Sequence, residues 1–131
     1  MLHVPYIAIA AAFALIYVPR FVVSREMARQ EGGYNNNDPR AQQARLEGRG
    51  RRALAAHQNA FEAFAPFAAG VLAAIQRGVR TDVVAYLCIA FVAVRMLYVA
   101  AYLADKANVR STMWGLGVVA IASLMVLAII G

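Results

Sequence analysis

Four polar side chains interrupt one of the apolar stretches of the chain and are the first candidates for chemistry. They are His57, Gln58, Asn59 and Glu62. On a helix, Asn59 and Glu62 share one face with Arg52, because the three positions are spaced seven and three residues apart. An ionised group in hydrocarbon costs several kcal/mol. This polar face is therefore expected to meet a partner or a cavity.

A second apolar stretch carries a polar face at a matching position. Arg95, Tyr98 and Tyr102 are spaced three and four residues apart and also share one side of a helix. Glu62 lies nine residues after Ala53, and Arg95 lies nine residues before Ala104, so each reaches about 14 Å into the membrane from the same side. We predict that Glu62 and Arg95 pair, since either alone is a penalised buried charge. This pair could also be a lock between helices without chemistry. A functional role is expected more for Asn59 and the two tyrosines, which lie nearer the membrane surface.

No metal site is expected. The only other histidine, His3, falls at the opposite membrane face from His57, so one chain cannot form a bis-histidine site. His57 is expected to be a residue near the helix end whose ring nitrogens find ordinary hydrogen-bond partners. The single cysteine, Cys88, excludes an internal disulfide and a multi-cysteine metal site. It has no activating base nearby and is expected to be a packing residue.

The elements that position these residues are apolar helices. Of the 131 residues, 62% are hydrophobic and 15% charged, too few polar side chains to cover a water-facing surface. Each of four apolar runs is near the ~20 residues that a helix needs to cross a bilayer, and none alternates like a transmembrane strand. We predict an all-α integral membrane protein, a single-domain antiparallel bundle of four transmembrane helices. The spans cover about 4–23, 53–75, 83–104 and 112–130.

The basic residues predict the orientation. The long first loop, about 25–52, carries seven arginines, and the third connection adds Lys106 and Arg110. Only Arg77 and Arg80 lie in the second connection, so the first and third loops are expected in the cytoplasm and both termini outside. Within the first loop, 32–40 has turn chemistry, whereas 45–54 is expected to be helical and to run into the second span. Despite the net charge of +6, these cations are placed to meet lipid headgroups, and no nucleic-acid partner is expected.

The run Arg51–Phe67 resembles the second helix of the MAPEG family, the membrane-associated proteins in eicosanoid and glutathione metabolism. That helix carries an R-A-x-x-N-x-x-E-x-x-x-P-like pattern, and here Asn59-x-x-Glu62-x-x-x-Pro66 fits its second half. Three further segments are similar to the family in the same order, and the resemblance covers almost the whole chain. They are the bacterial-type loop 33–40, Arg95-x-x-Tyr98-x-x-x-Tyr102 and Val109-Arg110-Ser111.

The resemblance implies a homotrimer in the bacterial inner membrane, with both termini periplasmic. It implies glutathione as cosubstrate, held between subunits near the cytoplasmic side, and a hydrophobic small-molecule substrate from the lipid. Asn59 and Glu62 of one subunit and Tyr98, Tyr102 and Arg110 of its neighbour would contact glutathione. Arg110 or Ser111 would stabilise the thiolate. The other expected binding residues are Arg25, Arg52 and Arg95.

The resemblance implies a glutathione-dependent transferase or peroxidase acting on hydrophobic electrophiles or lipid hydroperoxides. Three positions depart from the family: Ala55 and Gln58 stand where some relatives have arginine, and Ala63 where some have tyrosine. The loss at Ala55 favours an alternative, a non-catalytic protein of the same fold that acts as a binding or assembly partner. A second rival is a small proton-coupled exporter with Glu62 as carrier, which a paired Arg95 disfavours.

Overall fold

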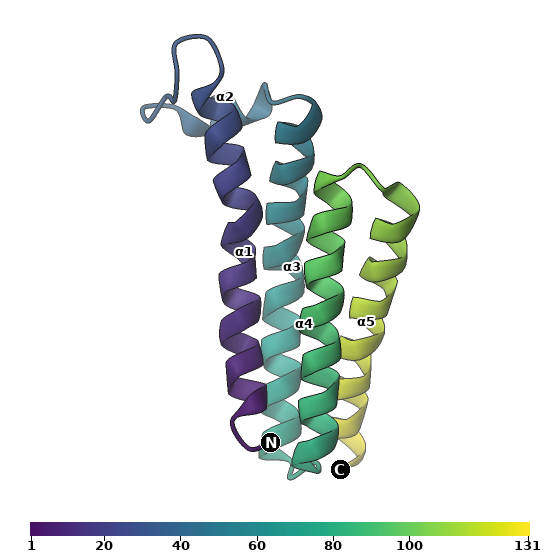
Figure 1. Ribbon diagram of the computed structural model, residues 1–131. Coiled ribbons are helices and arrows are strands. Elements are labelled where there is room, and N and C mark those ends of the chain that lie inside the picture. Colours follow the sequence, from purple (N-terminus) through teal and green to yellow (C-terminus); the bar gives the residue numbers. More distant parts are fainter.

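The computed structural model describes residues 1–131 and contains helices only. Four long helices lie side by side, with both termini at one end of the bundle (Figure 1). They are α1 (Val4–Ala28), α3 (Gly48–Gln76), α4 (Thr81–Leu103) and α5 (Ala107–Ile130). The all-helical prediction is confirmed. By length and composition, α1, α4 and α5 could each cross a membrane. The second predicted span, now part of α3, is not among them, because this helix is less apolar although it is the longest, at 29 residues.

The helices extend beyond the apolar spans, and the first connection contains a helix that the sequence reading missed. α1 continues to Ala28, and α5 begins at Ala107, so Arg110 and Ser111 are helical. The short α2 (Pro39–Ala44) occupies part of the segment assigned to a turn. Asp38 caps it by accepting a hydrogen bond from the Ala41 amide. The expected helix over 45–54 is interrupted, because α3 begins only at Gly48. Hydropathy marks only the apolar part of a helix, whereas the backbone hydrogen bonds continue into the polar residues on either side.

Gln42 holds the first connection against α1. Its side chain is 2% exposed. Nε2 donates to the carbonyl oxygens of Met27, at 3.1 Å, and Gly33, at 2.8 Å, while Oε1 accepts from the Asn35 amide at 2.8 Å. All the hydrogen-bonding groups of one amide side chain are thus used to fold the loop back on the helix end.

We expect Gln42→Leu to loosen this loop. The substitution keeps the size of the side chain but leaves the Gly33 carbonyl and the Asn35 amide without partners, at about 1–3 kcal/mol for each one that stays buried, while the Met27 carbonyl keeps its bond from the Gln30 amide. Limited trypsin digestion in detergent should then cut at Arg29 and Arg40 several times faster. Gln43→Leu is the matched control, because Gln43 is also buried but bonds only the Arg40 side chain. Equal cleavage of both variants would contradict this role of Gln42.

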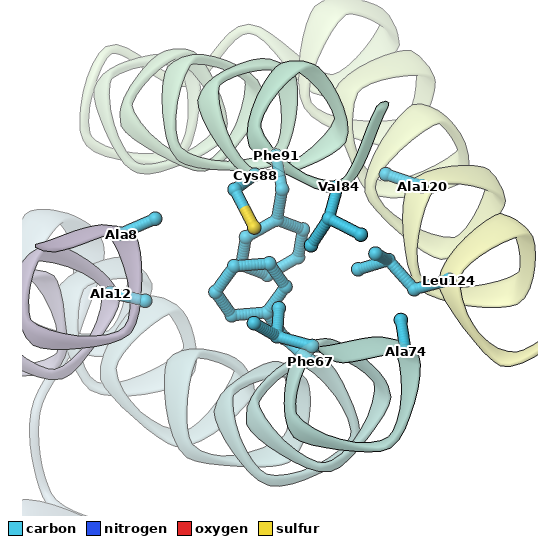
Figure 2. Packing of buried hydrophobic residues seen from close by; sticks show 10 residues of the cluster. Ala8, Ala12, Phe67, Ala74, Val84, Cys88, Phe91, Ala120 and Leu124 are labelled. Carbon is cyan, nitrogen blue, oxygen red and sulfur yellow. The ribbon is translucent and has the colours of Figure 1, made fainter. Parts of the chain in front are cut away.

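The core lies in the half of the bundle nearer the termini. The rings of Phe67 in α3 and Phe91 in α4 stack at 3.8 Å with an interplanar angle of 11°. Figure 2 shows them between Ala8 and Ala12 of α1 and Leu124 of α5. Cys88 is buried beside them, which confirms it as a packing residue. The stacked pair fixes α3 against α4 a short distance from Asn59 and Arg95, and so positions the polar residues described below.

Candidate functional site

Asn59 bridges Arg95, which is buried in the bundle, and Glu62, which lies on its surface. Arg95 Nη2 donates to Asn59 Oδ1 at 2.9 Å, and Asn59 Nδ2 donates to Glu62 Oε2 at 2.9 Å. The predicted direct pairing of Glu62 with Arg95 is therefore wrong, since no ion pair joins them. The amide of Asn59 offers both an acceptor and a donor, so it fits between a guanidinium and a carboxylate. Arg95 is 4% exposed, whereas Glu62 faces out of the chain.

Two tyrosines extend this arrangement along α4 towards α5. The Arg95 guanidinium carbon lies 4.1 Å from the centroid of the Tyr98 ring, and the Tyr98 and Tyr102 rings meet edge to face at 5.5 Å. Arg110 then lies over the Tyr102 ring at 4.7 Å. One chain thus carries an unbroken series of contacts from Glu62 to Arg110. We call it the polar ladder, and its members are Glu62, Asn59, Arg95, Tyr98, Tyr102 and Arg110.

The other predicted site residues lie outside the polar ladder. Arg52 Nη1 is 3.6 Å from Asp105 Oδ2, an acid that the sequence reading did not single out. Asp105 stands between α4 and α5 with a φ of 58°, and it is the only acid in that basic connection, a signal that could have found it. Arg25 and Ser111 are exposed, and their side chains make no hydrogen bond or ion pair within the chain. The structure therefore does not bring these two to the ladder.

A cavity of about 220 Å³ opens beside the polar ladder, between α3, α4 and α5. Asn59, Glu62 and Arg95 line it with polar groups, and Trp114, Val118 and Ile121 of α5 line it with apolar ones. The sequence reading missed the α5 residues. The signal for them in the sequence was their spacing. They follow Arg110 at intervals of four, four and three residues, which puts all four residues on one helical face.

His57 has a structural role, as expected. Its Nδ1 lies 2.8 Å from the carbonyl oxygen of Ile16 in α1, and its ring meets Phe61 edge to face at 5.2 Å. Ile16 lies one turn before Pro19, whose missing N–H leaves the carbonyl of the preceding residue, Leu15, without its helical donor. The histidine thus ties α3 to a weakened turn of α1.

We expect His57→Phe to destabilise the protein by about 1 kcal/mol, the usual net worth of one hydrogen bond. The phenyl ring keeps the aromatic contacts but cannot bond the Ile16 carbonyl. Thermal unfolding in detergent measures the loss as a lower midpoint. Tyr17→Phe removes a hydroxyl from an exposed ring in the same cluster and serves as the control. A midpoint unchanged from the wild type in His57→Phe would show that the bond contributes nothing.

The arrangement can bind a ligand that carries both amino and carboxylate groups. Glu62 offers a carboxylate at the cavity edge, and the guanidinium of Arg110 lies half-buried at the other end of the polar ladder. Guanidinium and carboxylate groups make the strong, charge-assisted hydrogen bonds that such a ligand needs. The adjoining apolar wall can hold a second, hydrophobic molecule.

Comparison with known proteins agrees with the residue patterns. No curated protein matches the chain. The model of the MAPEG family matches residues 4–130, which include all four long helices and every member of the polar ladder. With nearly the whole chain matched and three helices apolar enough to cross a membrane, the protein belongs to the MAPEG family.

Proposed function

We propose that the protein is a membrane-bound, glutathione-dependent transferase or peroxidase acting on hydrophobic electrophiles or lipid hydroperoxides. The observation that carries this proposal is the polar ladder, which joins a carboxylate, an amide, two phenols and two guanidinium groups beside a cavity. The MAPEG family includes enzymes of this kind as well as non-catalytic members. The ladder favours the catalytic reading.

The polar ladder and two arginines outside it, Arg52 and Arg25, are the proposed partners of the functional groups of glutathione. Glu62 uses one carboxylate oxygen to accept from Asn59, and its second oxygen is open to the ammonium group of glutathione. Tyr98 and Tyr102 place hydroxyl groups along the same side of α4. Arg52 and Arg25, at the same end of the bundle, are the outlying cations for the two carboxylates of glutathione. The hydrogen bond from the Arg95 guanidinium to Asn59 Oδ1 holds the Asn59 amide in place.

Arg110 is the proposed stabiliser of the thiolate, with Ser111 as a second donor. A thiol with a pKa of ~8.5 is mostly protonated near neutral pH, and only its thiolate is a good nucleophile. A half-buried guanidinium favours the anion more than an exposed one. The sulfur then bonds to a carbon of the electrophile, and the leaving group departs with its electron pair. With a hydroperoxide, sulfur attacks the outer oxygen, the O–O bond breaks, and the alkoxide leaves with the electron pair and takes a proton to become the alcohol, so the sulfur is oxidised to a sulfenic acid. A second glutathione completes the disulfide and releases water.

Glutathione binding to detergent-purified protein, measured by calorimetry, tests the proposal. We expect saturable binding that Arg110→Ala weakens about tenfold, the loss of one charge-assisted contact. Arg77→Ala is the matched control, because Arg77 is an exposed arginine at the opposite end of the bundle and should leave binding unchanged. Absence of binding at millimolar glutathione by folded protein would contradict the proposal and favour the non-catalytic alternative.

The surface of α3 supports the proposed homotrimer. One stripe of its exposed residues is spaced four and three apart and includes polar groups that lipid disfavours. These residues are Gln58, Glu62, Ala65, Ala69 and Leu72. A second copy would cover Gln58 and Glu62 and could approach closely at the two alanines. The polar ladder of one subunit would then lie next to a neighbouring subunit.

We expect both termini on the periplasmic side. Ten of the 13 Lys and Arg residues lie in 20–52 or 106–110, at the end of the bundle away from the termini, and the positive-inside rule places that end in the cytoplasm. A C-terminal alkaline phosphatase fusion should therefore be active in cells, and a C-terminal green fluorescent protein fusion dark. The opposite pair of signals would overturn this orientation.

A further inference from the structure

The apolar side of the cavity is built from one face of α5 that begins at Arg110. Trp114, Val118 and Ile121 follow Arg110 at intervals of four, four and three residues and line the cavity opposite Asn59 and Glu62. Trp114 is the only tryptophan of the chain, and it is 51% exposed. An indole that lines a cavity and remains half-open can stack on a second ring.

Trp114 lies one helical turn, about 6 Å along the axis, from Arg110. A molecule against the indole is thus next to the place where the thiolate would form. Gly117 also lines the cavity, and a Cβ added there would make ordinary contacts, 3.7 Å from Arg95 Cδ and 3.9 Å from Phe91 Cε2. The volume of about 220 Å³ exceeds the ~150 Å³ of an engineered cavity that binds benzene, so one substituted ring fits.

We propose that this wall binds the electrophile as an aromatic ring stacked on Trp114, which makes Trp114 the residue that selects aryl over aliphatic substrates. The inference rests on the proposed function and assigns the residue that determines which of its electrophiles bind, with electron-poor aryl halides as the probes. The glutathione thiolate attacks the ring carbon that bears the halide. A carbon–sulfur bond forms, the carbon–halide bond breaks, and the halide leaves with the electron pair. The thiol proton has already gone to solvent.

Binding at Trp114 can be measured without glutathione and without turnover. Dinitrobenzene has no leaving group and quenches indole fluorescence, so titration should give saturable quenching of the single tryptophan. The double variant Trp114→Phe, Leu116→Trp is the control. It moves the indole to the far side of α5, where Leu116 is 47% exposed, at nearly the same depth. There we expect linear quenching, from probe dissolved in the micelle. Linear quenching in both proteins would reduce Trp114 to an interfacial residue and overturn the inference.

Steady-state kinetics then test whether Trp114 selects aryl over aliphatic substrates. We expect Trp114→Leu to raise KM for chlorodinitrobenzene about three- to tenfold, the factor that an aromatic pair supplies, and Trp114→Phe to restore most of it. KM for glutathione and the activity towards linoleic acid hydroperoxide should change less than about twofold. An equal loss with both electrophiles, or no loss with the aryl halide, would overturn the selection. If calorimetry shows no glutathione binding, the proposed function fails. Saturable quenching at Trp114 would in that case show an aryl-binding site without the transferase reaction.

Discussion

Replacing Arg110 with alanine is expected to lower kcat/KM for glutathione transfer by about 10²–10³-fold. Removal of one preorganised group that stabilises developing or resident negative charge costs this much in other enzymes. Arg110 is the member of the polar ladder that α5 contributes, and its guanidinium is already held over the Tyr102 ring at 4.7 Å. The measurement is steady-state transfer to an aryl halide, together with the ultraviolet absorbance of bound thiolate.

Two further variants make this result specific. Arg110→Lys keeps the charge but loses the planar fork and its stacking on Tyr102, so we expect partial recovery of both activity and thiolate absorbance. Arg77→Ala, far from the site, should behave as wild type. Full activity in Arg110→Ala with normal thiolate absorbance would remove Arg110 from the reaction.

Phe67→Ala is expected to destabilise the protein by about 3–5 kcal/mol, the range for loss of a fully buried aromatic side chain. The substitution removes the ring that stacks on Phe91 and leaves a hole between α3 and α4. Equilibrium unfolding in a mixed detergent measures the loss. Because the stacked rings hold α3 in register with α4, glutathione affinity should fall as well.

The control for this prediction is Phe21→Ala, since Phe21 is 76% exposed and packs on no other ring. It should change stability by less than about 0.5 kcal/mol. Phe67→Leu, which keeps much of the volume, should lie between the two. Similar unfolding curves for Phe67→Ala and Phe21→Ala would show that the stacked pair is not the centre of the core.

The sequence predicted that Glu62 and Arg95 lie at one level of the bundle, but it did not predict their contacts. Counting residues along two helices placed Glu62 and Arg95 at the same level, and the structure joins them through Asn59. Residue counts place a side chain to within a helical turn, whereas a hydrogen bond depends on rotamers and on which neighbour is interposed. Asn59 was on the expected face, yet its bridging role could not be read from spacing alone.

Other features were missed for different physical reasons. The Asp38-Pro39 pair fits a turn and a helix start equally well, so α2 was hidden in the segment assigned to a turn. Gln42 is buried by the folding back of its loop, which local sequence does not encode. A tryptophan near the end of a span, such as Trp114, is typical of a membrane interface. Its place in the cavity wall depends on α3 lying opposite it, which the sequence alone does not show.

The bridge between Arg52 and Asp105 has a consequence for how the bundle responds to salt. It is the only ion pair that links two of the long helices or their connections, because the other two join residues close in sequence. Asp105 is 70% exposed in this pair, and the 3.6 Å separation is long, so dissolved ions screen it readily. The stacked phenyl rings carry no charge and feel no such screening. Raised ionic strength should thus loosen the end of the bundle where the proposed thiol would enter and leave the stacked core unchanged.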